Sequence, residues 1–300
     1  MLSVTILGNN SAVPAFNRHP TSQLVQHNGA GYLLDCGEGT QIQMIKYKVR
    51  RGRIGHIFIS HLHGDHYFGL VGLLNSFNLL SHKQPLHVWG PPQLQQIIEL
   101  QLGVAETEMC YPLHFHAITG AGVLLETETV RITAFPTTHR IPCFGFLFEE
   151  KIPKRKLLIE KIRSLRIPMS FYTSLQQGLD YITTQGETIA NGDVTTEPEK
   201  GQRYAFCADS RYDENILPYI QDADAIYHET TYLKNMQAKA GERFHSTTTD
   251  AAMMAKKAGV KKLLIGHFSS KYASLELFLR EAQEVFAHTQ LAIEGETYEM

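Results

Sequence analysis

The sequence has few cysteines, no long apolar run and no marked excess of charge of either sign. Its 300 residues include four cysteines, scattered along the chain without any Cys-x-x-Cys pair. This spacing argues against a disulfide scaffold and against a zinc site built from thiolates, and it suits a reducing compartment.

Targeting and membrane signals are also missing from the sequence. The first ten residues, MLSVTILGNN, lack the basic start and the long apolar core of a signal peptide. No stretch approaches the roughly 18 consecutive apolar residues of a membrane-spanning helix. We therefore expect a cytoplasmic protein with no part in a membrane.

The charge balance argues against a disordered chain and gives no general support for nucleic-acid binding. The formal net charge is −2 and charged residues make up 19% of the chain, so the sequence does not resemble a disordered, highly charged one. Global charge predicts no affinity for nucleic acid, so any nucleic-acid site must rest on a local cluster of cations.

Short apolar runs, many of them rich in β-branched and aromatic residues, recur along the chain and end in Gly, Pro, Ser or Asp, as strands followed by turns do. Stretches with helical spacing lie between them, at 38–48, 67–80, 93–102, 154–166, 246–258 and 274–287. This alternation predicts an α/β fold with buried sheets. Charge, Pro, Gly and Thr accumulate at about 150–200, so we expect a surface insertion there, within one domain spanning 1–300.

Ionisable side chains crowd the stretch SHLHGDHYFG at 60–69. Residues 56–60 are predicted to form a buried strand and residues 67–77 a helix. The cluster is therefore expected at the C-terminal end of a strand, where α/β sheets form ligand crevices. Crowded polar groups are costly unless water, a hydrogen-bond network or a metal satisfies them.

The spacing inside this cluster favours a metal. His61 and His63 are two residues apart, so they point the same way in an extended backbone. Asp65 and His66 follow at the predicted helix start, where the chain changes direction. One turn could therefore feed two adjacent ions, and neutral imidazole with carboxylate suits zinc. The alternative is a polar loop in which Asp65 merely caps the helix.

Three later residues, His139, Asp209 and His267, each stand where a predicted strand ends. Taken singly, Asp209 could cap a helix and each histidine could be a satisfied core residue. Their shared position favours a common site. His114 and His116 also stand two residues apart but lack an acidic follower, so we expect them to be structural.

The stretch HLHGDH is the HxHxDH signature of the metallo-β-lactamase superfamily, and the whole chain resembles that superfamily's ribonuclease Z family of tRNA 3′-end endonucleases. The matching stretches are LLDCGEGTQ (33–41), SHLHGDHYFGLVGLL (60–74), FCADSR (206–211), YHETTY (227–232), FHSTT (244–248) and IGHFSSKY (265–272). They follow the family's order over nearly the full length. The resemblance implies a four-layer αββα sandwich with a protruding arm insertion.

The resemblance also implies two Zn²⁺ ions per chain. The implied ligands are His61, His63 and His139 for one ion and Asp65, His66 and His267 for the other, with Asp209 bridging. Asp65 would in addition accept the proton of the attacking water.

A proton donor is suggested by the stretches HETTY and HST. His245 would be the general acid, and Glu229 would orient it and keep it protonated, because a neighbouring carboxylate raises the pKa of a histidine. The alternative is that the two are unrelated polar residues near helix starts.

Candidate RNA contacts lie in residues 151–166, which hold seven basic residues and one acidic residue. Lys154, Arg155 and Lys156 head this cluster, which could neutralise phosphates without reading sequence. The alternative is a helix with an ordinary solvated face. The resemblance favours RNA, since the family's arm at this place grips the tRNA.

The sequence therefore predicts a dizinc endoribonuclease that cleaves the 3′ trailer from precursor tRNA. It should leave a 3′-hydroxyl on the tRNA and a 5′-phosphate on the trailer, and the resemblance implies a homodimer. Two alternatives stay open. One is a metal-dependent phosphodiesterase or hydrolase of small molecules on the same fold. The other is a non-catalytic, zinc-containing RNA-binding protein, against which the complete ligand set argues.

Overall fold

The computed structural model describes residues 2–198 and 200–300. Contacts between residues divide the described chain into two compact units. The main unit contains residues 2–126, 130–149 and 202–300, and the inserted unit contains residues 127–129, 150–198 and 200–201.

The first sheet of the main unit has, among the described residues, seven strands in the order β20-β1-β3-β4-β5-β6-β7. They are β1 (Leu2–Gly8), β3 (Ser22–His27), β4 (Ala30–Leu34), β5 (Ile54–Phe58), β6 (Leu86–Gly90), β7 (Leu113–Ala117) and β20 (Thr297–Glu299). Pairing is antiparallel from β20 to β4 and parallel from β4 to β7.

The second sheet also has seven strands in the described part of the chain, in the order β19-β17-β16-β15-β10-β9-β8. They are β8 (Gly122–Glu126), β9 (Val130–Thr137), β10 (Cys143–Glu150), β15 (Arg203–Phe206), β16 (Ala225–Glu229), β17 (Lys262–Gly266) and β19 (Thr289–Leu291). A separate short pairing joins β2 (Asn10–Ser11) to β18 (Phe268–Ser269), and so links the loop after β1 to the loop after β17.

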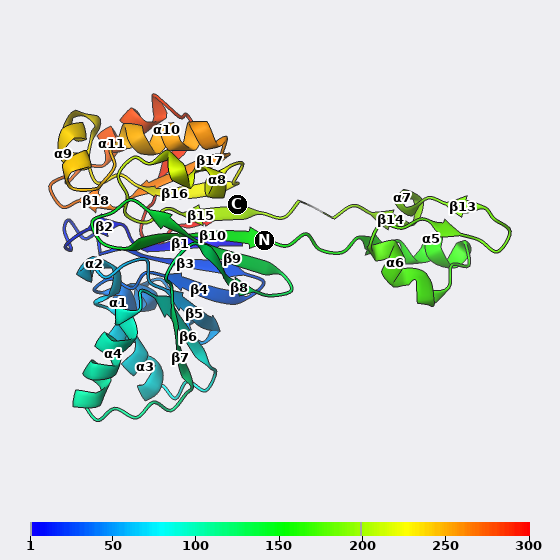
Figure 1. The fold of residues 1–300 in the computed structure, drawn as a ribbon, viewed down its shortest axis with the longest axis horizontal. Helices are drawn as coiled ribbons and strands as arrows, with labels where there is room; N and C mark the ends of the chain where they lie inside the picture. Colours follow the sequence, from blue (N-terminus) through cyan, green and yellow to red (C-terminus); the bar gives the residue numbers. More distant parts are fainter. Residues whose placement is uncertain (1, 199) are drawn as a thin grey trace. The chain divides into compact units, whose positions relative to one another are not determined.

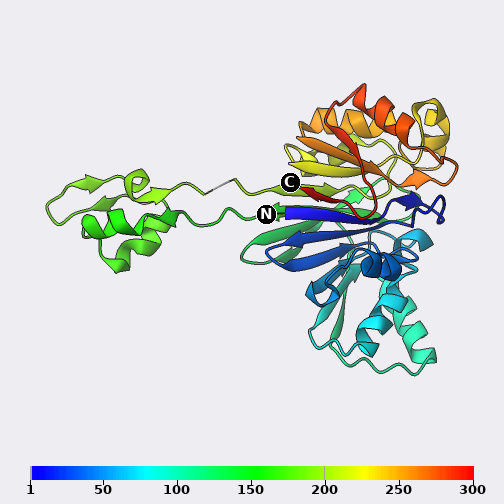
Figure 2. The same cartoon turned by 180° about the vertical axis from the view of Figure 1, so that it is seen from behind.

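Helices cover the outer face of each sheet (Figures 1 and 2). On the first sheet lie α1 (Thr40–Lys46), α3 (Leu70–Leu79) and α4 (Gln93–Val104), and on the second α8 (Leu217–Ile220), α10 (Thr248–Ala258) and α11 (Glu276–Gln283). The other helices of this unit are α2 (Gly64–Tyr67), α9 (Gln237–Glu242), η1 (Arg51–Arg53), η3 (Glu214–Ile216) and η4 (Lys234–Met236). The result is the expected four-layer αββα sandwich.

The packing between the two sheets is aromatic. The ring of Phe58 in β5 lies 5.4 Å from that of Phe146 and 6.1 Å from that of Phe148, both in β10, measured between centroids. Two further apolar clusters fill the spaces under the helices, one on each outer face. Most strands therefore bury both faces, which explains why they read as nearly continuous apolar runs in the sequence.

The inserted unit has its own small core of Ile162, Ile167, Leu175 and Val194. Its elements are β11 (Lys156–Leu157), α5 (Ile159–Ser164), η2 (Met169–Phe171), α6 (Tyr172–Gln176), β12 (Tyr181–Ile182), β13 (Thr188–Ile189), α7 (Asn191–Val194) and β14 (Thr195–Thr196). The Asn191 side-chain amide donates to the carbonyls of Leu175 and Leu179, each at 2.9 Å, and so ties α7 to the segment around α6.

The predicted helix over 154–166 is wrong in its first part. Lys156 and Leu157 pair with Thr196 and Thr195 as strands, so the helix begins only at Ile159. The extended backbone is held further by Arg155, whose Nε donates to Thr195 Oγ1 at 2.8 Å. A pairing between segments about forty residues apart overrides the local helical spacing.

The predicted helix over 67–80 is divided between α2 and α3. Gly69 stands at the break, and a Cβ there would lie 2.2 Å from the Gly37 carbonyl oxygen. The Gly69 N–H donates to the Cys36 carbonyl at 2.9 Å, so the loop after β4 packs directly on the break. Only glycine permits this approach, which fixes α2 and the side chains it carries. The other helices predicted in the main unit lie within their expected ranges or exceed them by two residues at most.

Helices that could span a membrane were sought over residues 2–198 and 200–300, and none there is both long and apolar enough.

The inter-sheet core sets a stability prediction. Leu264 in β17 is fully buried and Leu79 at the end of α3 is 84% exposed. Leu264→Ala should lower the free energy of unfolding by about 3–5 kcal/mol, because it removes buried methyl groups and leaves a cavity. The same change at Leu79 should alter it by less than about 0.5 kcal/mol. Urea unfolding of the two variants measures the difference, and equal losses would contradict this assignment of the core.

Candidate functional site

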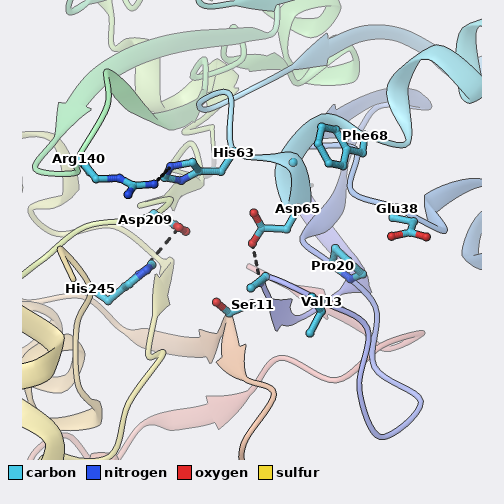
Figure 3. Close-up of a pocket in the computed structure, with 12 residues that line it drawn as sticks. Ser11, Val13, Pro20, Glu38, His63, Asp65, Phe68, Arg140, Asp209 and His245 are labelled. Atoms are coloured by element: carbon cyan, nitrogen blue, oxygen red, sulfur yellow. Dashed lines mark hydrogen bonds and ion pairs between the residues drawn. The ribbon is translucent and has the colours of Figure 1, made fainter.

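The seven residues predicted to bind metal lie together at one edge of the sandwich. His61 and His63 follow β5, and Asp65 and His66 lie in α2. His139, Asp209 and His267 follow β9, β15 and β17, so both sheets contribute to the same edge. Their nitrogen and oxygen atoms form groups whose members lie within 4.8 Å of one another. Figure 3 shows several of the side chains around the adjoining hollow.

The first group consists of three histidines and Asp209. His63 Nδ1 lies 3.0 Å from His61 Nε2 and 3.1 Å from His139 Nε2. Asp209 Oδ2 is 3.8 Å from His61 Nε2 and 3.9 Å from His139 Nε2. Four atoms that can each donate a lone pair therefore converge on one point.

The second group consists of Asp65, His66 and His267. Asp65 Oδ2 lies 3.6 Å from His66 Nε2 and 3.5 Å from His267 Nε2. Asp209 reaches this group with its other oxygen, Oδ1, at 3.5 Å from His66 Nε2 and 3.2 Å from His267 Nε2. The two oxygens of Asp209 thus face different groups, as a bridging carboxylate requires.

Three buried atoms of these groups have no hydrogen-bond partner in the described part of the chain. They are His66 Nε2, His267 Nε2 and Asp209 Oδ1, and all three face the second group. Buried polar atoms are nearly always satisfied. A cation would satisfy these three together, so the residues present fit metal ions.

The far side of three histidines of these groups is held by a hydrogen bond. His66 Nδ1 donates to Asp35 Oδ2 at 2.7 Å, and His139 Nδ1 donates to the Phe244 carbonyl at 3.0 Å. His267 Nδ1 donates to Thr231 Oγ1 at 2.9 Å. Each bond places the ring hydrogen on Nδ1 and leaves the Nε2 lone pair toward the group, which is the usual orientation of metal-ligating histidines.

Charge within the site suits divalent cations. Burial lowers the pKa of His61 well below its usual value and that of His63 to about 4, so both rings are neutral as ligands must be. Burial opposes ionisation of Asp209, but His267 and His66 lower its pKa well below the usual range. Despite its burial, His66 has its pKa raised well above normal by Asp209, Asp65 and Asp35. The carboxylates thus concentrate negative charge at this point.

A buried ion pair stands beside the two groups. His245 Nδ1 lies 2.8 Å from Glu229 Oε1, and Glu229 is fully buried at the end of β16. Burial of His245 favours the neutral ring, but the Glu229 charge outweighs it and raises the pKa of His245 to about 9. Thr231 Oγ1 donates to Glu229 Oε2 at 2.7 Å and fixes the carboxylate. His245 therefore favours its protonated form at neutral pH and could donate a proton. His245 also lies close to Asp209 and His267. Because its Nδ1 is already paired with Glu229, we do not expect these three residues to hold a metal ion together.

Two adjoining hollows open onto these side chains, with volumes of about 460 and 350 Å³. Both are bordered by Ser11, Ala12, His63, Arg140 and His245. The larger also touches Asp65, Asp209 and Phe68, and the smaller touches His139, Tyr232 and Arg243. An extended ligand could thus lie across the site.

Two residues of this site gave no signal in the sequence. The Ala12 N–H donates to Asp65 Oδ2 at 2.7 Å, and Ala12 holds a left-handed φ of 64° to do so. Arg140 reaches His63. Asp35 and Thr231, by contrast, lie inside the stretches DCGEG and HETTY that the resemblance singles out, so a closer reading of those stretches could have found them.

Three other histidines and the basic cluster lie outside the two groups. His228 is buried and its Nδ1 donates to the Glu229 carbonyl. His114 and His116 lie in β7, where both rings stack on His87. Lys154, Arg155 and Lys156 belong to the inserted unit, where Lys154 and Lys156 are exposed. The Arg155 guanidinium is engaged by Thr195 and by Glu197 at 3.4 Å, which makes it the least available of the three.

Comparison with known proteins agrees with this architecture. Residues 2–154 match the family model described as anti-Pycsar protein Apyc1. A ribonuclease Z of Porphyromonas gingivalis is 41% identical over 97% of this chain and 97% of its own length. A ribonuclease Z of Cytophaga hutchinsonii is 41% identical over 98% of this chain and 94% of its own length.

Solved structures are similar over the same extent. The short form of human tRNase Z is 27% identical and superposes with a TM-score of 0.74, covering 99% of this chain and 98% of its own. The metallo-β-lactamase fold protein YhfI of Bacillus subtilis is 20% identical with a TM-score of 0.72, covering 100% and 99%, and shows the shared fold. The chain therefore belongs to the ribonuclease Z family, and through its residues 2–154 also to the family that the anti-Pycsar model describes.

Proposed function

We propose that this protein is a metal-dependent endoribonuclease that removes the 3′ trailer from precursor tRNA. The observation that carries the proposal is Asp209 placed between two histidine groups, beside a histidine charged by Glu229. The chain's likeness to ribonuclease Z over 97% of its length supports RNA as the substrate class.

The family and the two groups imply metal ions, and we propose two Zn²⁺ per chain. His61, His63 and His139 would hold one and Asp65, His66 and His267 the other, with Asp209 bridging. Zinc at such a site lowers the pKa of water to near 7 and neutralises charge that develops on a phosphate.

Proton transfer falls to this chain's own residues. Asp65, oriented by the Ala12 N–H, would accept the proton of the attacking water. His245 would protonate the departing 3′-oxygen of the tRNA, a poor leaving group without a proton. Because the leaving oxygen is the sugar 3′-oxygen, the tRNA would keep a 3′-hydroxyl and the trailer would carry a 5′-phosphate.

The inserted unit supplies candidate cations for the tRNA backbone. Lys154 and Lys156 are exposed, as are Lys161 and Arg163 on α5. Such side chains bind phosphates without reading bases. We further propose that the protein acts as a homodimer in the cytoplasm, with the inserted unit of one subunit serving the partner's site.

The decisive experiment incubates a 3′-extended tRNA with the purified protein and maps both ends of the cut. Cleavage directly after the acceptor stem, with a 5′-phosphate on the trailer, is expected. The Asp209→Asn variant should lose cleavage, because one of the two carboxylate oxygens, each of which faces a different group, becomes an amide nitrogen. Intact precursor after incubation with the zinc-loaded wild-type protein would refute the proposal.

A histidine pair tests the metal assignment. His267→Ala should lower the bound zinc below two ions per chain and reduce activity at least 100-fold, since even outer partners of metal ligands typically cost about 10–100-fold. His116→Ala, in the stack on β7, should change neither quantity. Zinc content by plasma emission spectroscopy checks both, and full zinc occupancy in His267→Ala would contradict the assigned ligand set.

The general acid makes a prediction about pH. His245 must be protonated to act, so activity should fall as pH rises through its pKa of about 9. Glu229→Gln removes the charge that raises this pKa, and the falling limb of the rate profile should therefore move to lower pH. Rate profiles of kcat for both proteins measure the shift. An unmoved limb in Glu229→Gln would assign the proton donation to another group.

The basic residues of the inserted unit are tested without Arg155, whose loss would also disturb the unit's own fold. The Lys154→Glu/Lys156→Glu pair should weaken tRNA binding and reduce the slope of log affinity against log salt by roughly 0.7–0.9 per lost phosphate contact. Hydrolysis of bis(p-nitrophenyl) phosphate should be unchanged. Lys83→Glu/Lys256→Glu, which alters two exposed lysines of the main unit, matches the charge change. Equal loss of tRNA binding in the two pairs would contradict a specific RNA contact.

A further inference from the structure

Arg140 lies between the two hollows of the cleft. It directly follows His139, is exposed, and borders both hollows (Figure 3). We propose that Arg140 binds the non-bridging oxygens of the scissile phosphate, which rests on the proposed function as a phosphodiester hydrolase. Arg140 would thus be a substrate-binding residue of the reaction centre.

The Arg140 guanidinium has a single polar contact among the described residues. Its Nη2 lies 3.1 Å from His63 Nε2. Within residues 2–198 and 200–300, no carboxylate lies within ion-pair distance of it. A guanidinium carries five N–H donors, so most of them are unused by the protein. Charged donors left unpaired beside a cleft favour an anionic ligand.

The contact with His63 is itself incompatible with a loaded metal site. His63 turns Nδ1 toward His61 and His139, so Nδ1 is its ligand atom. A neutral histidine that ligates through Nδ1 carries its hydrogen on Nε2. Nε2 would then be a donor facing another donor, and Arg140 could not bond to it. Its guanidinium would therefore be available to a ligand in the cleft.

The charges around the cleft call for such a cation. Glu38 borders the larger hollow and Glu242 borders the smaller one, and both would repel an incoming phosphodiester. A planar guanidinium can pair with two phosphate oxygens at once, which fixes orientation as well as charge.

Arg140 also lies where a phosphate between two nucleotides of an RNA strand would be expected. His63, Arg140 and His245 border both hollows, so a phosphate held among them would place one nucleotide in each hollow. Other nearby arginines do not share this place. Arg243 borders only the smaller hollow, and the Arg211 guanidinium lies 5.4 Å from the centre of the Phe244 ring.

The experiment compares Arg140→Ala and Arg140→Lys with the wild-type protein, each loaded with zinc. Arg131→Ala is the matched control, because Arg131 is exposed and pairs with Glu126 at 2.9 Å on β8. The measurements are kcat and KM for 3′-extended tRNA and for bis(p-nitrophenyl) phosphate, the Kd of inorganic phosphate by calorimetry, and zinc content.

Arg140→Ala should lower kcat/KM roughly 10- to 100-fold on both substrates and weaken phosphate binding by about 10-fold or more, the range typical of one hydrogen bond to a charged group. Zinc content should equal that of the wild type. Arg140→Lys should recover part of the loss, because lysine keeps the positive charge but lacks the planar group that pairs with two phosphate oxygens. Arg131→Ala should change nothing.

Unchanged phosphate affinity and kcat/KM in Arg140→Ala would overturn the proposal. Loss of zinc in that variant would overturn it too, since Arg140 would then act by supporting His139. A wild-type protein that hydrolyses the diester but leaves tRNA intact would refute the tRNA function alone. The phosphate Kd decides the role of Arg140 even if neither substrate is cleaved.

Discussion

The site depends on one buried carboxylate that faces two ways. Asp209 presents Oδ2 to His61 and His139 and Oδ1 to His66 and His267. An ionised carboxylate in a buried position is costly unless positive charge or donors compensate it. Here the imidazoles alone leave Oδ1 without a hydrogen bond in the described chain. The fold therefore places a buried negative charge here that needs a nearby cation.

The side chains around Asp209 come from both sheets of the sandwich. His61, His63, Asp65 and His66 come from the first sheet, and the remaining residues of the two groups come from the second. The short β2–β18 pairing links the loop carrying Ala12 to the loop carrying His267, and Ala12 holds Asp65. Outer hydrogen bonds then set the tautomers. Hydrogen bonds between loops of both sheets therefore orient the side chains of the site.

Glu229 and His245 are also positioned by strands that carry residues of the two groups. Glu229 lies at the end of β16, adjacent to β15 and β17, which lead to Asp209 and His267. Burial makes its charge act strongly on His245, because interactions between charges strengthen as water is excluded. Thr231 serves both neighbours, donating to Glu229 and accepting from His267. His245, Glu229 and the second histidine group thus share one hydrogen-bond network.

The sequence by itself determined the α/β class, the main helices and the candidate ligands at 61–66, 139, 209 and 267, because apolar periodicity, the HxHxDH spacing and the ends of predicted strands are local signals. The stretches HETTY and HST, together with the family resemblance, also identified Glu229 and His245. Only the tertiary structure showed that Ala12 and Arg140 lie at the site, since a backbone N–H or a lone arginine carries no pattern of its own. It also decided that Lys156 lies in a strand, because its partner, Thr196, is forty residues away. Chemistry that depends on convergence of distant segments is visible only when the chain is folded.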